Sequence, residues 1–321
     1  MILITGATGN IGSELVTQLL TEGSPLRVIA RDERKLSHLD RRVERVAGDL
    51  HERSVVQRAL QGVERLFMLS ILFDTNHEAD RLLIDEAKRA GVRQLVKISS
   101  GAVRLAGKGG IGGLHREKER FVEESGIPWT FLRPGAFMSN TLQWVGTIKS
   151  QSQVFNPTGE GKFAPISPHD IAAVAAVALT SDGHEGKAYE LTGPELLSAH
   201  DQVRILSDVL GKSIQCVDIP IEVAAERFKA TGAPEFLVEG LTDLWTRVRE
   251  GRGTFQTNEV EKLTGKPARP SRPGAATIGP HFSRSDLSDL LCVVAPPASP
   301  PSAGGCGRAQ RLAGEKVAIR D

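Results

Sequence analysis

The sequence has little of what would place it in several large protein classes. It contains three cysteines in 321 residues, with no CxxC pair and no clustered Cys/His spacing, so neither a structural zinc site nor a disulfide framework is expected. The histidines are scattered without ligand spacing, and no metal site is predicted. The net charge of +1 gives no sign of a nucleic-acid-binding surface.

Long hydrophobic stretches and targeting signals are also lacking. The longest apolar run, residues 171–179, is far too short to span a bilayer, so no membrane partner is expected. The N-terminus runs from Met1 directly into an apolar stretch and a glycine-rich turn, without a basic region or a cleavage site. The cytoplasm is therefore the expected compartment.

What the first half does contain is a regular alternation of short apolar runs and amphipathic segments. The pattern predicts strands at 2–5, 26–30, 43–46, 65–70, 94–99 and 129–132, and helices at 11–20, 54–60, 76–90 and 115–124. The apolar runs do not alternate with polar residues, which is typical of strands buried on both faces. The sequence therefore predicts an α/β fold with a Rossmann-type, doubly wound parallel sheet.

After about residue 150 strands and helices no longer alternate regularly. A hairpin is predicted at 153–165, helices at 171–179, 198–210, 222–231 and 235–249, and strands at 188–191 and 214–219. We assign residues 1–150 plus about 166–192 to the Rossmann domain. Residues 151–165 and 193–268 are assigned to a smaller α+β region on the substrate side. Residues 269–321 are rich in Pro, Gly, Ser, Ala and Arg and are expected to be disordered.

The most informative stretch is ITGATGNIGSE, at residues 4–14. Its three glycines, Gly6, Gly9 and Gly12, lie between the first strand and the first helix. Such a turn lets backbone N–H groups and a helix N-terminus approach a pyrophosphate. Thr8, Asn10 and Ile11 belong to the same turn and are predicted cofactor contacts. The alternative is a tight turn that only allows close packing of the helix.

The ends of the next strands suggest which dinucleotide is bound. Arg31 follows the second strand, where an arginine can hold the 2′-phosphate of NADP and an acidic residue would favour NAD. The sequence thus favours NADP(H), with NAD(H) still open, and a merely solvated Arg31 is the alternative. Asp49 and Leu50 are predicted to meet the adenine, and Ser70 to lie near the ribose.

Several segments together resemble the NmrA-like branch of the atypical short-chain dehydrogenases/reductases. They are LITGATGNIG, GDL, AKRAGVRQLVKISS, HREKERFVEESGIPWTFLRPGAFMSN, HDIAAVAAVAL and YELTGPE, and the resemblance covers about residues 1–268. The branch includes NAD(P)H-dependent quinone, azo-dye and triphenylmethane-dye reductases. It also includes redox-sensing regulators that bind the dinucleotide without turning it over.

Typical short-chain dehydrogenases use a Tyr-x-x-x-Lys pair to pass a proton to the substrate oxygen. This chain has one tyrosine, Tyr189, and His115 and Glu119 occupy the two positions of the pair. The substrate is therefore expected to be a quinone or another conjugated acceptor, whose reduced form is stabilised without an enzymic acid. His115 is a candidate proton donor, and the alternative is a histidine that only bonds the loop above it.

Other site residues follow from the ends of the fifth and sixth strands. Lys97 and Ser99 are expected beside the nicotinamide, where Ser99 either orients the cofactor or substrate or has a simple turn role. The resemblance places the RPGAFMSN segment against the nicotinamide and the substrate cleft. This implies a cofactor contact at Pro134 and an acceptor wall of Phe137, Met138, Asn140 and Trp144, although the aromatic and sulfur side chains could equally be core.

Two functions remain open from the sequence. The first is an NAD(P)H-dependent oxidoreductase acting on a small conjugated acceptor, and the second is a non-catalytic NADP(H) sensor that binds a protein partner. A nucleotide-sugar epimerase is permitted by the fold, but the missing Tyr-Lys pair argues against it. The intact apolar segment 135–144 favours the reductase, as a monomer or a homodimer.

Overall fold

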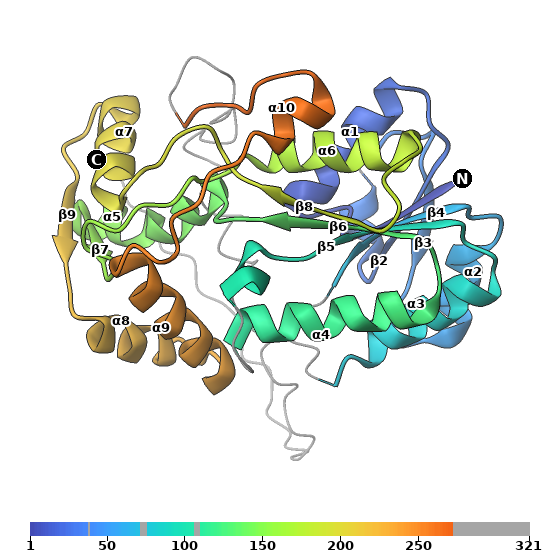
Figure 1. The fold of residues 1–321 in the computed structure, drawn as a ribbon, viewed down its shortest axis with the longest axis horizontal. Coiled ribbons are helices and arrows are strands. Elements are labelled where there is room, and N and C mark those ends of the chain that lie inside the picture. Colours follow the sequence, from blue (N-terminus) through green and yellow to red (C-terminus); the bar gives the residue numbers. More distant parts are fainter. Residues whose placement is uncertain (38, 71–75, 106–109, 272–321) are drawn as a thin grey trace, which may run out of the picture.

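A seven-stranded parallel sheet forms the centre of the molecule (Figure 1). The computed structural model describes residues 1–37, 39–70, 76–105 and 110–271. The strand order is β3-β2-β1-β4-β5-β6-β8, which confirms the Rossmann-type, doubly wound sheet predicted from the sequence. The strands are β1 Ile2–Thr5, β2 Leu26–Ala30, β3 Glu44–Ala47, β4 Arg65–Leu69, β5 Gln94–Ile98, β6 Trp129–Pro134 and β8 Lys187–Leu191.

Helices cover both faces of this sheet (Figure 1). One face carries α1 Asn10–Thr21, α6 Pro168–Thr180 and α10 Glu259–Thr264, and the other carries α2 Arg53–Leu60, α3 Glu78–Arg89 and α4 Gly110–Ser125. Alanine and valine dominate α6, and eight of its residues are buried. Because these side chains are small, α6 lies directly against both α1 and the sheet.

The residues of β5 alternate between the two layers, as a strand requires. Val96 and Ile98 join the apolar core beneath α1 and α6. Leu95 points to the opposite layer, and so does the fully buried Lys97, which interacts with charged groups of α3 and α4. The second layer therefore receives charged side chains as well as apolar ones.

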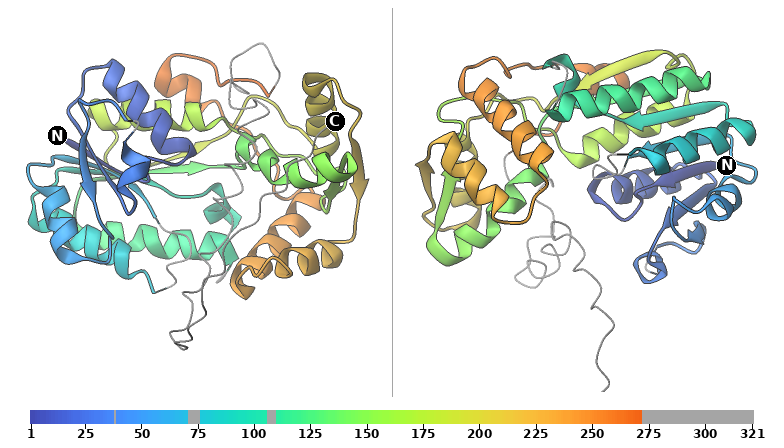
Figure 2. Two further views of the ribbon diagram at one scale, coloured as in Figure 1. Left: turned by 180° about the vertical axis from the view of Figure 1, so that it is seen from behind. Right: turned by 90° about the horizontal axis from the view of Figure 1, so that it is seen from below.

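The smaller region lies beyond the carboxyl ends of β5, β6 and β8 (Figure 2). It is built on a two-stranded parallel sheet of β7 Gln153–Asn156 and β9 Gln215–Asp218. Its helices are α5 Val145–Gln151, α7 Ala199–Leu210, α8 Ile221–Lys229 and α9 Glu235–Arg249, and three short 3-10 turns complete the described elements: η1 Glu33–Leu36, η2 Gly101–Leu105 and η3 Met138–Trp144. None of the helices in the described part of the chain is long and apolar enough to cross a membrane.

Two expectations about the second half need correction, and one helix was missed. The predicted hairpin at 153–165 is wrong, because β7 pairs in parallel with the distant β9 rather than with the following segment. Helix α10 was not predicted, and it returns to pack on α6. The expected disorder from residue 269 is wrong for 269–271: the N–H of Arg269 donates to Asp170 at 2.7 Å, and that of Ser271 to Glu195 at 3.2 Å. Residues 272–321 lie outside the described residues.

Candidate dinucleotide and acceptor site

The glycine turn after β1 has the geometry that a pyrophosphate requires. Gly6 has a φ of +68°, and a Cβ at Gly12 would lie 2.1 Å from the carbonyl oxygen of Gly6. A side chain at Gly12 would therefore push α1 away from the turn. Gly9 forms the N-cap of α1 without any side-chain hydrogen bond, so the first N–H groups of the helix keep their capacity for an anion.

The other predicted residues of the turn divide by exposure. Thr8 and Asn10 are exposed beside Gly9. The Ile11 side chain is buried in the core under α1, so it could contribute only its backbone N–H to a cofactor. Thr8, Gly9 and Asn10 thus form the exposed part of this turn.

The order of the strands reverses between β1 and β4: β2 and β3 are added on one side of β1, and β4 and the later strands on the other. Dinucleotides bind at this switch point in such folds. Thr5 fixes the two strands, since its Oγ1 accepts a 2.8 Å hydrogen bond from the N–H of Leu69. The hydroxyl of Ser70 follows directly and is buried without a hydrogen-bond partner among the described residues. Buried hydroxyls are almost always bonded, so an unpaired one at this point fits a ligand group.

At the end of β2, the arginines and the acidic residue have separate roles. Asp32 binds the guanidinium of Arg34 through both oxygens, at 3.0 and 3.1 Å, and these hydrogen bonds lower the pKa of Asp32. Arg31 is exposed and has no hydrogen bond or ion pair with another described residue. The acidic side chain is thus committed to its neighbour, while Arg31 remains available for a phosphate.

The residues predicted to meet the adenine lie just after β3. Asp49 accepts hydrogen bonds from the His51 backbone N–H at 2.9 Å and pairs with its Nδ1 at 2.7 Å. The backbone bond from His51 lowers the pKa of Asp49. Leu50 is half-buried and packs against the core on the α3 side of the sheet.

The fully buried carboxylate of Glu119 is the centre of a network that the sequence did not predict. Its oxygens accept hydrogen bonds from the guanidinium of Arg133, both at 2.8 Å, and from the hydroxyl of Ser99 at 2.7 Å. Arg116 adds a contact at 3.2 Å. Burial opposes ionisation, but the bonds from Arg133 and Ser99 outweigh it and lower the pKa of Glu119. The ends of β5 and β6 are thereby joined to α4.

This network determines what Ser99 can do. Its hydroxyl already donates to Glu119, and the residue is 3% exposed. The geometry favours a positioning role over direct contact with a substrate. The catalytic assignment of Ser99 stays a prediction.

His115 lies one helical turn before Glu119 on α4. Its Nδ1 is buried and has no hydrogen-bond partner among the described residues. Burial and the positive charges of Lys97 and Lys118 lower the pKa of His115 to about 3. The ring is therefore neutral near pH 7, and it can offer a neutral N–H but not an imidazolium.

Lys97 is buried completely behind the end of β5. Its Nζ donates to the carbonyl of Ile98 at 2.8 Å, and burial lowers the pKa of its ammonium to about 8. Asp80 and Lys118 form a buried ion pair at 2.9 Å in the same layer. With no exposed surface, Lys97 acts on the site through its charge, and its contact with a cofactor stays a prediction.

The predicted acceptor wall is split between two cores. Phe137 packs against the large apolar core, and Trp144 packs against the core of the smaller region. Met138 is half-buried and Asn140 is exposed, both on η3. Pro134, at the end of β6, is buried. Segment 134–144 thus connects the sheet to the smaller region.

A second aromatic contact near the ends of β5 and β8 was missed. The guanidinium of Arg104 lies 4.6 Å from the ring centroid of Phe255 and 3.0 Å from Glu190. A Cβ at Gly101 would meet the Phe255 ring at 2.9 Å, so the small residue there makes room for it. The three partners come from segments far apart in sequence, and no local pattern signals their contact.

Strand order, glycine turn and unpaired hydroxyl together define a dinucleotide-binding α/β protein. Residues 6–182 match the family model described as NAD(P)H-binding. The chain belongs to the NAD(P)H-binding, NmrA-like family of atypical short-chain dehydrogenases/reductases, which includes NAD(P)H-dependent quinone and azo reductases.

Three relatives cover most of the chain. The (4-alkanoyl-5-oxo-2,5-dihydrofuran-3-yl)methyl phosphate reductase of Streptomyces griseus is 39% identical over 88% of this chain and 99% of its own. The NAD(P)H azoreductase of Xenophilus azovorans is 37% identical over 84% and 94%, respectively. The NADPH-dependent quinone oxidoreductase of Escherichia coli, solved with NADPH, superposes with a TM-score of 0.74 at 27% identity, over 91% of this chain and all of that one.

Proposed function

We propose that this protein is an NADPH-dependent reductase that transfers hydride to a quinone or a similar conjugated acceptor. The observation that carries the proposal is the arrangement at His115 and Glu119. Glu119 is fully engaged by Arg133 and Ser99, and His115 is held neutral. A neutral imidazole and an ionised carboxylate are both weak proton donors, which favours an acceptor that is reduced without a strong enzymic acid.

The relatives support this acceptor class. The names of two of them describe an azo compound and a quinone as substrates. The name of a third describes an unsaturated lactone with an alkanoyl substituent. Each acceptor delocalises the charge that hydride addition leaves behind, and the final proton can then come from solvent.

The roles of the chain's own residues follow from their positions. Gly6, Gly9 and Gly12 bring backbone N–H groups to the pyrophosphate, Ser70 hydrogen-bonds the ligand at the switch point, and Arg31 reads a 2′-phosphate. When bound, the reduced nicotinamide supplies the hydride. Glu119 holds the ends of β5 and β6 in place, so that acceptor and cofactor meet in a fixed orientation.

The decisive experiment is oxidation of NADPH by purified protein with a panel of quinones, with NADH in parallel. We expect saturable turnover and a preference for NADPH. Arg31→Asp should remove most of that preference, since it exchanges an attraction for the 2′-phosphate for a repulsion. Arg41→Asp is the matched control, because it makes the same change of charge at another exposed arginine.

Two results would contradict the proposal. Equal loss of preference in Arg31→Asp and Arg41→Asp would remove Arg31 as the phosphate reader. Tight binding of NADP+ without oxidation of NADPH by any acceptor would favour the sensor, and a protein partner should then be sought.

A further inference from the structure

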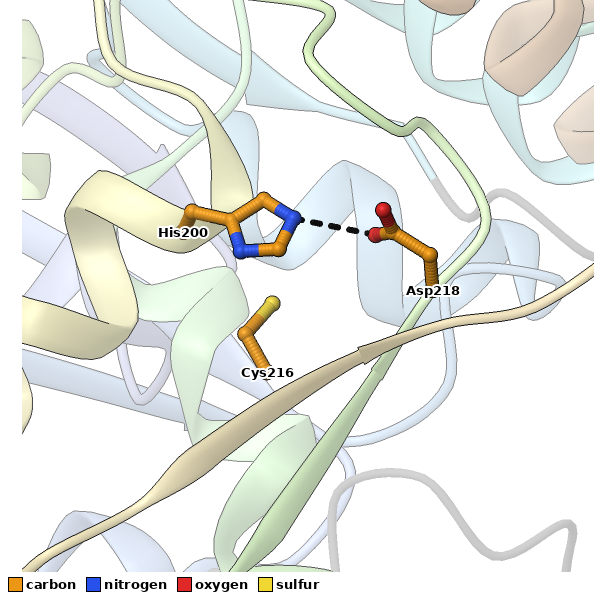
Figure 3. Close-up of side chains that lie close together, drawn as sticks. All are labelled: His200, Cys216 and Asp218. Carbon is orange, nitrogen blue, oxygen red and sulfur yellow. Dashed lines mark hydrogen bonds and ion pairs between the residues drawn. The ribbon is translucent and has the colours of Figure 1, made fainter.

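Three donor side chains of different chemistry meet in the smaller region (Figure 3). His200 comes from the first turn of α7, and Cys216 and Asp218 come from β9. One donor atom of each residue lies within 4.8 Å of the other two. The cluster shares no residue with the proposed dinucleotide site, and the wide spacing of its members along the chain hid it from sequence analysis.

The fold fixes each of the three positions. Cys216 and Asp218 are two residues apart on β9, so they point to the same face of the small sheet. The capping box of Ser198 and Asp201 fixes the start of α7, and with it the place of His200. His200 Nε2 lies 3.0 Å from Asp218 Oδ1.

A fourth donor and a supporting contact surround the cluster. Glu160, in the loop after β7, brings Oε1 to 3.9 Å from His200 Nε2. Asn156 of β7 donates from Nδ2 to Asp218 Oδ1 at 2.7 Å and so orients that carboxylate. Groups of this kind, which hold a ligand from behind, accompany most metal sites.

We propose that His200, Cys216 and Asp218 bind a divalent transition-metal ion of the zinc class, with Glu160 as a fourth ligand. Zinc takes imidazole, thiolate and carboxylate ligands at about 2.0–2.3 Å in a tetrahedron, which requires donors about 3.3–3.8 Å apart. Donors already within 4.8 Å reach this geometry by small side-chain rotations. The ion would take the place of the proton between His200 Nε2 and Asp218, and that proton would move to Nδ1 of the imidazole.

The electrostatics of the cluster favour a cation and disfavour a free thiolate. Burial and the negative charges of Asp218 and Glu160 raise the pKa of the Cys216 thiol to about 11. The same carboxylates attract a divalent ion, and when the metal–sulfur bond forms, the thiol proton leaves to solvent. A bound ion would tie α7, β9 and the loop after β7 together.

Cobalt(II) is the probe of choice, because a cobalt–thiolate bond gives a charge-transfer band and tetrahedral cobalt gives intense visible bands. We expect metal-free, full-length protein to bind one Co2+ per chain with both signals, and Zn2+ to displace it. Cys216→Ser should abolish the charge-transfer band. Cys292→Ser with Cys306→Ser is the matched control and should retain it, since the proposed site takes its thiolate from Cys216.

Thermal unfolding gives an independent measurement. Zn2+ should raise the unfolding temperature of the unmodified protein but not that of His200→Ala, because a ligand stabilises only the state that binds it. His51→Ala, which breaks another histidine–carboxylate pair at 2.7 Å, should respond as the unmodified protein does. A charge-transfer band that survives Cys216→Ser, a band that disappears in the variant with Cys292→Ser and Cys306→Ser, or no saturable binding would each overturn the proposal.

Discussion

On the α6 face of the sheet, β5 and β6 present Val96, Ile98 and Leu132 to an apolar layer. On the α4 face, the same two strands and the residue after β5 present Lys97, Arg133 and Ser99. At these positions the first face is apolar, whereas the second buries charged groups such as Glu119 and Lys97 beside its apolar side chains. The two faces should therefore respond differently to substitution, acid and ligand.

The largest expected effect is that of Glu119→Ala on the charged face. It leaves Arg133 without its carboxylate, and breaking a buried pair costs about 3–5 kcal/mol of the free energy of unfolding. Adding Arg133→Met should restore a large part of this loss, because the uncompensated charge is then removed as well. Chemical denaturation of the single and double variants measures both quantities.

Leu132→Ala is the comparison on the opposite face, one residue away on β6. It should cost a similar amount, about 2–5 kcal/mol, through the cavity it leaves. No second substitution at Arg133 should restore this loss. If Arg133→Met rescues both variants equally, the distinction between the faces fails.

Acid should affect the charged face more than the apolar one. Since the folded-state pKa of Glu119 is lowered, its contribution to stability is complete above the unfolded pKa of about 4.3 and is lost as the pH falls through the folded value. Stability measured by denaturation from about pH 6 to pH 3 should therefore fall less steeply in Glu119→Gln than in the unmodified protein. Leu132→Ala should keep the steep dependence, and equal slopes in all three would refute the assignment.

A smaller effect is expected for Ser70→Ala, at the residue that directly follows β4. Its buried hydroxyl has no partner among the described residues, so the free protein should change in stability by less than about 0.5 kcal/mol. Binding of NADPH should weaken about fivefold, the value of one hydrogen bond of about 1 kcal/mol. Calorimetry and denaturation together test this, and a loss of stability without loss of affinity would make Ser70 structural.

For His115 we expect no effect on the pH dependence of the turnover number near neutral pH. Burial and the charges of Lys97 and Lys118 keep His115 neutral, with a pKa of about 3. Between about pH 5 and pH 8 the turnover number should show no inflection that His115→Gln removes. An inflection near pH 6.5 that is lost in His115→Gln would show that the imidazolium donates a proton.

The first half of the fold could be predicted almost completely from sequence. Short apolar runs and the glycine turn are local signals, and a parallel sheet is assembled from consecutive units. The second half was harder because its contacts are distant: the Gly-Glu-Gly turn at 159–161 looked like a hairpin, but Val154 pairs with Cys216 across 62 residues. Periodicity cannot reveal such a partner.

The same difference applies to the site. The positions of Gly6, Gly12, Arg31 and Ser70 followed from the order of strands. In the structure Gly6, Arg31 and Ser70 directly follow β1, β2 and β4, and Gly12 lies in the first turn of α1, while their contact with a cofactor stays a prediction. The role of Glu119 did not follow from the sequence. It depends on Arg133, which lies on β6, whereas Glu119 lies on α4. The sequence showed only that Glu119 occupies the lysine position of the Tyr-x-x-x-Lys pair. It could not show that the Glu119 carboxylate is hydrogen-bonded to Arg133 and Ser99.

The hydrogen bonds between Glu119 and Arg133 limit how this chain could acquire the Tyr-x-x-x-Lys pair of typical short-chain dehydrogenases. Introducing a Tyr-Lys pair by His115→Tyr and Glu119→Lys would set a new ammonium among the guanidinium groups that now hold Glu119, Arg116 and Arg133. Glu119→Lys would therefore be unfavourable without further substitutions at those arginines. An attempt to introduce the Tyr-Lys pair should therefore also replace Arg133, which makes two hydrogen bonds to Glu119.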